Sequence, residues 1–253
     1  MSTDGPDGFG VRQGARTTQR RGRMTAARHA TLAELGPAWM LSPADAADPG
    51  ALARAFGRRA PRLLDIGAGN GEAARAWAGD HLDHDVVAVD LHRPGLARLV
   101  RDLHDAGPAT VRAVEADALA LLEATPPGTF AAIRVLFPDP WPKRRHVGRR
   151  LVDPAFVRLA ADHLPVGGTL HLATDWDDYA QQMRASVATD ARLRPQVDVV
   201  DPEPEPERSA PAPGATAGPR WRTDRPARPV TAYEQRGLDA GRPITDLVAV
   251  RER

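Results

Sequence analysis

Short apolar segments that alternate with helical segments constrain the fold of this chain more than any other feature of its sequence. Strand-like segments cover residues 62–66, 85–90, 110–115, 130–136 and 168–173, and a last one covers residues 246–250. Helical patterns lie over residues 72–78, 94–104, 118–122, 153–163 and 175–188. Strands that alternate with helices predict an α/β fold, in which a doubly wound, mostly parallel sheet has helices on both faces.

Three of the predicted helices carry signals at their ends. A helical pattern that begins at residue 25 should end at Gly36-Pro37, because proline breaks a helix. Asp153 is expected to cap the helix that follows it, with Pro154 in the first helical position. Asp175 is expected to cap the helix over residues 175–188 in the same way.

Polar residues and glycines gather where the predicted strands end. The loop Gly67-Ala-Gly-Asn-Gly71 follows the first strand, and acids follow four later ones: Asp90, Asp117, Asp139 and Asp175. Ligands of open parallel sheets bind outside the carboxyl ends of the strands. The sequence therefore predicts an active site along one edge of the sheet.

The composition excludes several classes of protein. The 253-residue chain has no cysteine, which excludes disulfides, thiolate zinc sites, iron–sulfur clusters and a cysteine nucleophile. The histidines show no metal-ligand spacing, so no metal is expected. No apolar run approaches the roughly 20 residues that span a bilayer, and the N-terminal arginines precede no apolar signal segment. We therefore expect a soluble cytoplasmic protein without a membrane partner.

Two stretches are expected to lack a fixed structure. Residues 1–20 are rich in glycine, arginine and threonine without periodicity, which predicts a flexible basic tail. Residues 201–227 are dominated by proline, glutamate, alanine, glycine and arginine, which predicts a mobile loop. The remaining length, residues 21–253, fits one domain that contains this loop.

Positive charge is segregated although the formal net charge is only +1. Residues 12–28 carry arginines and no acid, and residues 143–150 carry lysine and arginines and no acid. Compensating acids lie elsewhere, for example at Asp201 and Glu203. Two acid-free basic clusters indicate contact with the phosphate groups of a nucleic acid.

The second cluster directly follows the motif Phe137-Pro-Asp-Pro-Trp-Pro-Lys143. Proline restricts its own backbone and that of the preceding residue, so the motif should hold Asp139 and Trp141 in set directions. A fixed acid, a flat aromatic ring and cations together suit a site that grips a nucleic-acid base. The alternative is a proline-rich turn followed by a solvated basic run.

The glycine loop and three acids indicate a nucleoside without phosphate. Glu72 stands where a dinucleotide fingerprint has its third glycine, and an acid there disfavours a pyrophosphate and hence a nicotinamide oxidoreductase. Asp90 could accept hydrogen bonds from a ribose diol, Asp117 from an exocyclic amine and Asp65 from an ammonium group. S-adenosylmethionine has all three groups. A tight turn with loop-capping acids is the alternative.

These motifs closely resemble the bacterial, single-subunit tRNA (guanine-N7-)-methyltransferases over most of the chain. The resemblance rests on Asp117 and on residues 21–25, 64–71, 89–94, 137–150, 173–176 and 228–237. It implies a Rossmann-like class I methyltransferase fold with a seven-stranded sheet, S-adenosylmethionine as cofactor and tRNA as partner. The implied reaction methylates N7 of the guanine at position 46 in the variable loop. A monomer or a homodimer is expected.

The resemblance also implies roles for individual residues. Asp139 would be the active-site residue. The residues implied to contact S-adenosylmethionine are Asp65, Gly67, Gly69, Gly71, Asp90, Asp117 and Asp139. Those implied to hold the substrate or touch RNA are Lys143, Arg145, His146, Arg149, Arg150, Asp175, Thr231, Tyr233 and Glu234. The family usually has glutamate at the positions of Asp65 and Asp90, so these carboxylates are one methylene shorter here.

Guanine N7 carries a free lone pair, so we assign Asp139 no role as a general base. We expect Asp139 and Glu234 to accept hydrogen bonds from the guanine N1–H and N2 amine, and Trp141 or Tyr233 to stack on the base. Two other functions stay open. A methyltransferase for another substrate would share the glycine loop and the acids, and a non-catalytic RNA-binding protein would need only the basic clusters.

Overall fold

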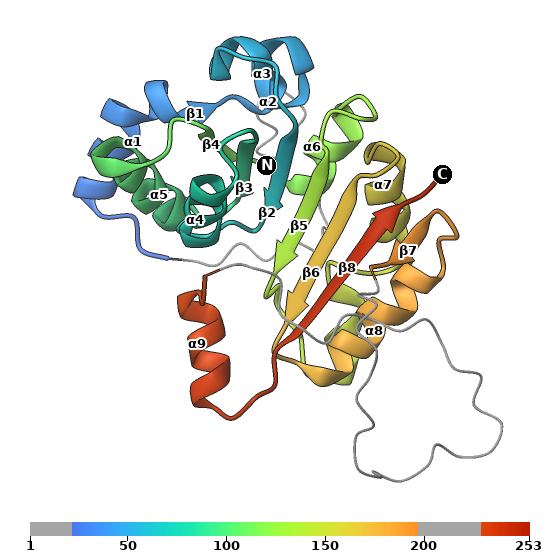
Figure 1. Cartoon of the computed structure of the whole chain (residues 1–253). Coiled ribbons are helices and arrows are strands. Elements are labelled where there is room, and N and C mark those ends of the chain that lie inside the picture. The colour runs from blue at the N-terminus through green and yellow to red at the C-terminus, as the bar shows by residue number, and fades with distance from the viewer. Residues whose placement is uncertain (1–21, 197–228) are drawn as a thin grey trace, which may run out of the picture.

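A mostly parallel sheet runs through the computed structural model, which describes residues 22–196 and 229–253 (Figure 1). Within those residues the sheet has eight strands in the order β1-β4-β3-β2-β5-β6-β8-β7. Only β8 is antiparallel to its neighbours, β6 and β7. The strands are β1 (Met40–Leu41), β2 (Arg62–Ile66), β3 (Asp85–Asp90), β4 (Val111–Glu115), β5 (Ala132–Leu136), β6 (Thr169–Thr174), β7 (Leu193–Pro195) and β8 (Thr245–Arg251).

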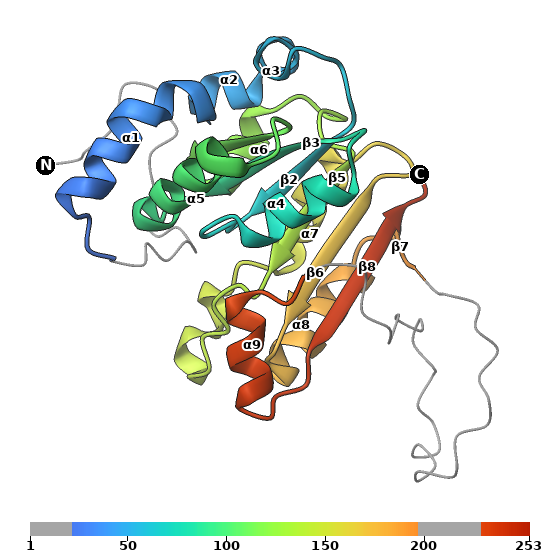
Figure 2. The same cartoon turned by 60° about the vertical axis from the view of Figure 1, so that its left-hand side comes forward.

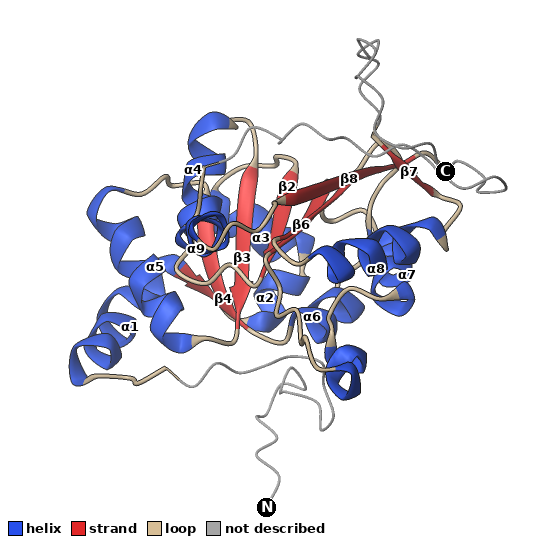
Figure 3. Cartoon of the chain, turned by 90° about the horizontal axis from the view of Figure 1, so that it is seen from below, coloured by secondary structure: helices blue, strands red, loops and turns tan. Residues whose placement is uncertain are grey.

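Helices cover both faces of this sheet, as the alternating pattern predicts (Figures 2 and 3). One hydrophobic cluster packs α1, α4 and α5 against the sheet, and the other packs α2, α3, α6, α7 and α8 against it. The helices are α1 (Ala26–Trp39), α2 (Pro43–Ala47), α3 (Pro49–Phe56), α4 (Glu72–Asp80), α5 (Arg93–Ala106), α6 (Ala118–Ala124), the 3₁₀ helix η1 (Arg144–Arg149), α7 (Pro154–His163), α8 (Asp177–Ala188) and α9 (Ala232–Asp239). The predicted doubly wound α/β class is confirmed.

The strand sequences explain why both faces are covered. In β2, Leu63 belongs to the cluster on one face, whereas Leu64 and Ile66 belong to the cluster on the other. Successive side chains of a strand point to opposite faces, so a strand with apolar residues at both kinds of position must be buried on both sides. This burial is why the central strands appear in the sequence as continuous apolar runs.

The parallel register brings the carboxyl ends of the central strands to one edge. Ile66 of β2 pairs with Val89 of β3, and Asp90 pairs with Glu115 of β4. On the other side of β2, Ile66 pairs with Val135 of β5. The loops that follow these strands therefore leave the sheet together.

Two predictions about elements are wrong. The first helix does not end at Gly36-Pro37 but continues to Trp39 with Pro37 inside it. Pro37 removes one helical N–H donor, and the packing of Leu35 and Trp39 in the hydrophobic cluster offsets that loss. The expected strand count of seven is one too low, because β1 has only two residues and carries no readable pattern.

Two short helices near the N-terminus begin with a capping residue followed by proline. Ser42 caps α2 by accepting from the backbone N–H of Asp45 at 3.0 Å, and Pro43 follows it. Asp48 caps α3 by accepting a hydrogen bond from the backbone N–H of Gly50 at 2.8 Å, and Pro49 follows it. A capping residue directly before proline is a typical helix start. The predicted Asp153 cap of α7 follows the same rule and is confirmed, with a 2.9 Å hydrogen bond from Phe156 N–H.

The predicted flexible tail over residues 1–20 and the predicted mobile loop over residues 201–227 lie outside the described residues. The assignment of residues 21–253 to one domain stays a prediction. Within residues 22–196 and 229–253, no helix has the length and apolar character needed to cross a membrane.

Gly71 joins the glycine loop to α4 and lies tightly against Leu99 of α5. Its φ is +71°, and a Cβ there would lie 2.2 Å from Cδ1 of Leu99 on α5. We expect Gly71→Ala to lower the free energy of unfolding by about 2–4 kcal/mol, because it combines backbone strain with overpacking. Denaturant unfolding of the variant measures this loss.

Gly79→Ala is the matched control for this prediction. Gly79 lies in the same helix, and a Cβ there would meet nothing within 4 Å. Its replacement should leave stability unchanged or raise it slightly. Equal stabilities of the two variants would contradict the assigned role of Gly71.

Candidate active site

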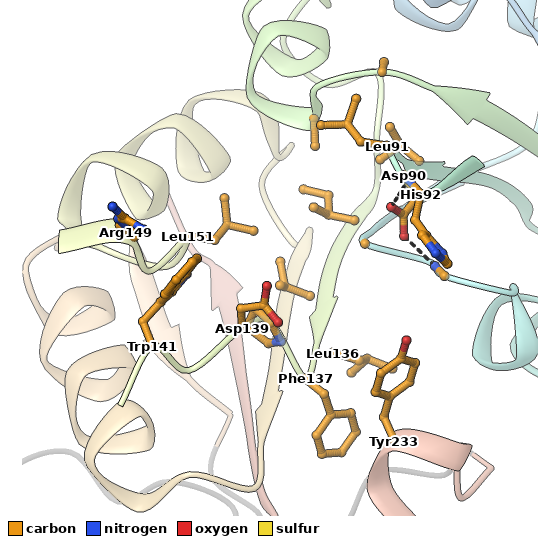
Figure 4. A pocket seen from close by; sticks show the side chains of 18 residues that line it. Asp90, Leu91, His92, Leu136, Phe137, Asp139, Trp141, Arg149, Leu151 and Tyr233 are labelled. Atoms are coloured by element: carbon orange, nitrogen blue, oxygen red, sulfur yellow. Dashed lines mark hydrogen bonds between the residues drawn. The ribbon is translucent and has the colours of Figure 1, made fainter. Parts of the chain in front are cut away.

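A cavity opens at the carboxyl ends of β2, β3 and β5, where the sequence predicts an active site (Figure 4). Its walls come from the glycine loop, the turn after β3, the segment around Ala116, the proline-rich motif and Tyr233 of α9. The lining side chains that matter for the chemistry below are those of Asp90, His92, Asp139, Trp141, Arg149 and Tyr233. Five chain segments that are far apart in sequence thus share one cavity.

The glycine loop turns sharply because three of its residues adopt the left-handed conformation. Gly67, Gly69 and Gly71 have φ values of +74°, +60° and +71°. The loop is closed by hydrogen bonds from Gly67 N–H to the Val89 carbonyl at 2.9 Å and from Gly71 N–H to the Ala68 carbonyl at 2.8 Å. The backbone of Gly67 and Gly69 can therefore approach a ligand in the cavity closely.

Asp90 holds this loop from the end of β3. Its Oδ2 accepts a hydrogen bond from Gly69 N–H at 2.7 Å, and its Oδ1 accepts one from His92 N–H at 2.7 Å (Figure 4). Both oxygens belong to a side chain that lines the cavity, and each keeps a second lone pair. Asp90 is thus both a loop cap and a possible ligand contact, the two readings that its position in the sequence left open.

Asp65 forms a buried ion pair that the sequence analysis did not predict. Nε of Arg134 donates to Oδ1 of Asp65 at 2.9 Å, and the two side chains are 2% and 4% exposed. Arg134 stands directly beside Asp65 in the parallel ladder of β5 and β2. Its Nη1 and Nη2 have no hydrogen-bond partner among the described residues. The cue was a lone arginine inside an apolar strand, which requires an acidic partner nearby.

A second, smaller cavity adjoins Asp65. It is lined by Asp65, Glu72 and the start of α9 with Thr231 and Tyr233, together with the glycine loop. Tyr233 lines both cavities and lies beside Gly69, so α9 closes over the glycine loop. Glu72 helps to hold α9 there, since it accepts a hydrogen bond from Ala232 N–H at 3.3 Å.

Asp117 lies deeper than the other acids. It is almost fully buried and caps α6, where Oδ1 accepts from Leu119 N–H at 2.9 Å. Its neighbours Ala116 and Ala118 line the cavity, whereas Asp117 does not. The contact of Asp117 with a cofactor therefore stays a prediction.

The proline-rich motif carries strained backbone at both ends. Phe137 and Trp141 have φ values of +51° and +42°, which non-glycine residues rarely adopt. Each such residue costs on the order of 1–3 kcal/mol and persists only where the surroundings enforce it. Between them, Asp139 points into the cavity, with Trp141 on one side and Tyr233 on the other (Figure 4).

The basic cluster continues from this motif as η1. Lys143, Arg145 and Arg149 are exposed. The guanidinium carbon of Arg149 lies 5.1 Å from the ring centre of Trp141, and the His146 ring meets the same indole edge-on at 5.5 Å. Arg149 therefore lines the cavity beside the indole of Trp141, and Lys143 and Arg145 are exposed in the same short segment.

Arg150 departs from the expectation that it touches RNA. Its side chain is 2% exposed and pairs with Asp178 of α8 at 2.7 Å. A guanidinium that is buried and already paired is not available to a phosphate at the surface.

Asp175 does not cap α8, so this prediction is wrong. The N-cap of α8 is Trp176, which makes no side-chain capping bond. Asp175 instead accepts a hydrogen bond from Arg242 Nε at 2.8 Å and packs against Gly237 of α9. A tertiary contact explains this difference. The ion pair with Arg242 draws the Asp175 carboxylate toward α9 and away from the start of α8.

The terminal motif begins α9 with a capping sequence. Thr231 accepts a hydrogen bond from Glu234 N–H at 3.2 Å, and Glu234 is buried. Tyr233 is 37% exposed, and the guanidinium carbon of Arg236 lies 4.4 Å from the centre of its ring. The structure thus brings Tyr233 into the cavity, whereas Glu234 lies beneath the surface.

Comparison with known proteins agrees with this geometry. A family model described as "Putative methyltransferase" matches residues 59–213. The tRNA (guanine-N(7)-)-methyltransferase of Alkalilimnicola ehrlichii is 42% identical, over 90% of this chain and 89% of the relative. The protein of the same name from Methylococcus capsulatus is 42% identical over 90% of each chain, and that from Xanthomonas campestris is 39% identical over 98% of this chain and 88% of its own.

The chain belongs to the tRNA (guanine-N(7)-)-methyltransferase family. The predicted family resemblance is confirmed. Solved structures agree on the fold: the aminoglycoside resistance methyltransferase NpmB1 matches with a TM-score of 0.50 and 15% identity, over 81% of this chain and 93% of its own. The antibiotic-resistance methyltransferase Kmr matches with the same TM-score and identity, over 81% and 92%.

Among residues 22–196 and 229–253, no three His, Asp or Glu side chains are placed to hold a metal ion.

Two contacts at the site have no counterpart among the sequence-based predictions. They are the ion pair of Arg134 with Asp65 and the hydrogen bond from Ala232 N–H to Glu72.

The charge state of His146 reports on the basic cluster. Desolvation and the positive charges of Arg149 and Arg145 lower the pKa of His146. We expect its ring to titrate below the ordinary value of about 6.5, and so to be mostly neutral at pH 7. An NMR titration, with the His146 resonance assigned from His146→Gln, measures the midpoint.

Arg149→Ala should raise that midpoint, because it removes a like charge that disfavours the protonated ring. Arg158→Ala removes an exposed arginine of α7 that is not among the charges lowering the pKa of His146, so it should leave the midpoint unchanged. A midpoint at or above the ordinary value in the unchanged protein would contradict this account of the cluster.

Proposed function

We propose that this protein transfers the methyl group of S-adenosylmethionine to N7 of a guanine in tRNA. The observation that carries the proposal is the position of Asp139 and Trp141, which lie between a glycine-loop nucleoside site and exposed cations in one cavity. The names of the relatives, all called tRNA (guanine-N(7)-)-methyltransferase, support the same reaction.

The residues present fit S-adenosylmethionine. The backbone of Gly67 and Gly69 lines the cavity, and Asp90 offers a free lone pair on each oxygen to a ribose diol. Glu72 in the first turn of α4 would repel a phosphate at the place where dinucleotide folds bind one. A nucleoside with a sulfonium and no phosphate suits this site better than a dinucleotide.

We propose that the amino-acid end of the cofactor lies in the second cavity. Asp65 lines it and would attract the ammonium group, and Gly71 shapes the helix start beside it. Asp117 remains our candidate for the exocyclic amine of the adenine, since both of its chain neighbours line the main cavity.

The guanine would enter from the side of the cations. We propose that Asp139, which lines the cavity, accepts hydrogen bonds from the guanine N1–H and N2 amine, which selects guanine over adenine. Glu234 is buried and lines neither cavity, so it would share this contact only after a movement of α9 uncovers it. Trp141 or Tyr233 would stack on the base after it leaves its RNA stack. Lys143, Arg145, His146 and Arg149 would hold the RNA, with Asp175 and Thr231 positioning α9 beside it.

The chemistry requires alignment more than proton transfer. When bound, S-adenosylmethionine would supply the methyl group: the N7 lone pair would form the new bond to the methyl carbon, and the electron pair of the broken carbon–sulfur bond would stay on the sulfur, so the positive charge would move to the purine. No proton moves in this step, so no general base is needed. A carboxylate such as Asp139 would stabilise the positive charge on the sulfonium before the transfer as well as on the purine during it. It therefore lowers the barrier only by the difference between these two stabilisations, and alignment of the reacting atoms matters more.

Finer details extend this proposal. The target would be position 46 in the variable loop, and the protein would act as a monomer or homodimer in the cytoplasm. Methyl transfer from labelled S-adenosylmethionine to bulk tRNA, followed by mapping of the methylated nucleotide, tests both the reaction and the position. Labelled product on another substrate, or cofactor-independent RNA binding alone, would favour the two alternatives instead.

Asp139→Ala should lower methyl transfer by about 10²-fold or more, because the base loses its alignment with the methyl carbon. Binding of S-adenosylmethionine measured by calorimetry, and the unfolding midpoint, show whether the variant remains folded. Asp105→Ala, which removes an exposed acid from α5, is the matched control and should keep full activity. Normal turnover of Asp139→Ala would refute the assignment.

Arg145→Ala and Arg149→Ala should each weaken tRNA binding and reduce the slope of log K against log salt by about 1. The reason is that each exposed guanidinium releases counterions when it meets a phosphate. Arg158→Ala should leave the slope unchanged. If all three variants kept the slope of the unchanged protein, the RNA surface would lie elsewhere on the molecule.

A further inference from the structure

Arg149 and Arg150 are neighbours in sequence but lie in opposite environments. Arg149 is exposed and lines the cavity, whereas the side chain of Arg150 is 2% exposed. Arg150 also lies over the ring of Tyr179, with its guanidinium carbon 4.7 Å from the ring centre. Burial raises the pKa of Tyr179 to about 12, so the arginine lies on a neutral aromatic ring.

Each nitrogen of this guanidinium already has a partner. Nε donates to the backbone carbonyl of Pro140 at 2.7 Å. Nη1 donates to Oε1 of Gln182 at 2.9 Å, and Nη2 donates to Oδ1 of Asp178 at 2.7 Å. Arg150 therefore ties the residue next to Asp139 to two side chains of α8, and its charge is balanced within the protein.

The same face of α8 also holds Val152, at the other end of the segment that begins at Pro140. Val152 N–H donates to the hydroxyl of Tyr179 at 3.0 Å, and the side-chain amide of Gln182 donates to the Val152 carbonyl at 3.1 Å. Pro140 and Val152 are thus both fastened to α8. The basic residues of η1 lie on the chain between these two points.

The fastened segment is the one whose backbone is strained. Phe137 and Trp141 have positive φ, and Asp139 lies between them. Strained backbone persists only where surrounding contacts enforce it. The hydrogen bond to the Pro140 carbonyl is a contact of that kind, made at the residue between Asp139 and Trp141.

We propose that Arg150 is a positioning residue, which holds the Pro140 carbonyl so that Asp139 and Trp141 face the cavity, and that it does not contact RNA. The inference rests on the proposed function for its kinetic consequences. Its structural part, the fastening of the loop to α8, stands on the contacts alone.

Arg149→Ala and Arg150→Ala form a matched pair that separates the two roles. Arg150→Ala should lower kcat by about 10²-fold, because a small displacement of the reacting groups has that effect. Its KM for tRNA and the salt dependence of binding should stay within about twofold of the unchanged protein. Arg149→Ala should do the reverse, raising KM and flattening the salt dependence.

Asp178→Ala provides a second variant in case Arg150→Ala fails to fold. The Asp178 side chain is 59% exposed, so its loss should not unfold the protein. It removes one anchor of Arg150 and should lower kcat in the same direction by a smaller factor. Cofactor titration confirms that each variant is folded.

Amide hydrogen exchange gives a readout that does not depend on activity. The amides of Asp139 and Trp141 should exchange faster in Arg150→Ala and Asp178→Ala, and at the normal rate in Arg158→Ala. If the unchanged protein failed to methylate tRNA, the proposed function would fall, and this exchange would still test the fastening.

Two outcomes would overturn the inference. One is an Arg150→Ala protein with normal kcat and a flattened salt dependence, which would make Arg150 an RNA contact. The other is unchanged amide exchange at Asp139 and Trp141 in both variants, which would mean that Arg150 does not hold the loop.

Discussion

The parallel, hydrogen-bonded register of β4, β3, β2 and β5 brings together the loops that form most of the cavity wall. Because Ile66 pairs with both Val89 and Val135, the three loops that follow these strands leave the sheet at one level. Each loop then contributes one part of the site: the glycine turn, the acid at Asp90 and the proline-rich motif. A shift of one strand by a single residue would turn its side chains to the other face and separate these parts.

Charged side chains in this structure serve two separate purposes. Those that are paired within the protein hold other segments in place. Asp90 holds the glycine loop, Arg150 holds the Pro140 carbonyl, and Asp175 holds the turn after α9 through Arg242. Those that are exposed, such as Arg145 and Arg149, remain available to phosphates. Removing one member of a fully buried pair costs roughly 3–5 kcal/mol, a penalty that applies here to Arg134 and Asp65. This division suits a reaction that depends on alignment and moves no proton.

Much of the fold could be predicted because its signals are local or periodic. The apolar runs of the strands, the positive-φ glycines and the Asp153-Pro154 cap each follow from a few adjacent residues. The failures have one cause. Pro37 continues a helix that tertiary packing stabilises, and β1 pairs with β4 although its two residues carry no pattern. In the first case, contacts made far away in sequence overrode the local preference, and in the second they formed a strand where the local sequence shows no preference.

The sequence by itself determined the fold class, the edge that carries the site and the family to which the chain belongs. It also identified Asp139 and the basic cluster, since rare motifs place these residue types together. Only the tertiary structure decided what each charge does there. Arg149 and Arg150 are the same residue type at adjacent positions, yet one faces the cavity and the other pairs with α8. The physical reason is that the role of a charge depends on its burial and its partners, and both are set by elements that lie far along the chain.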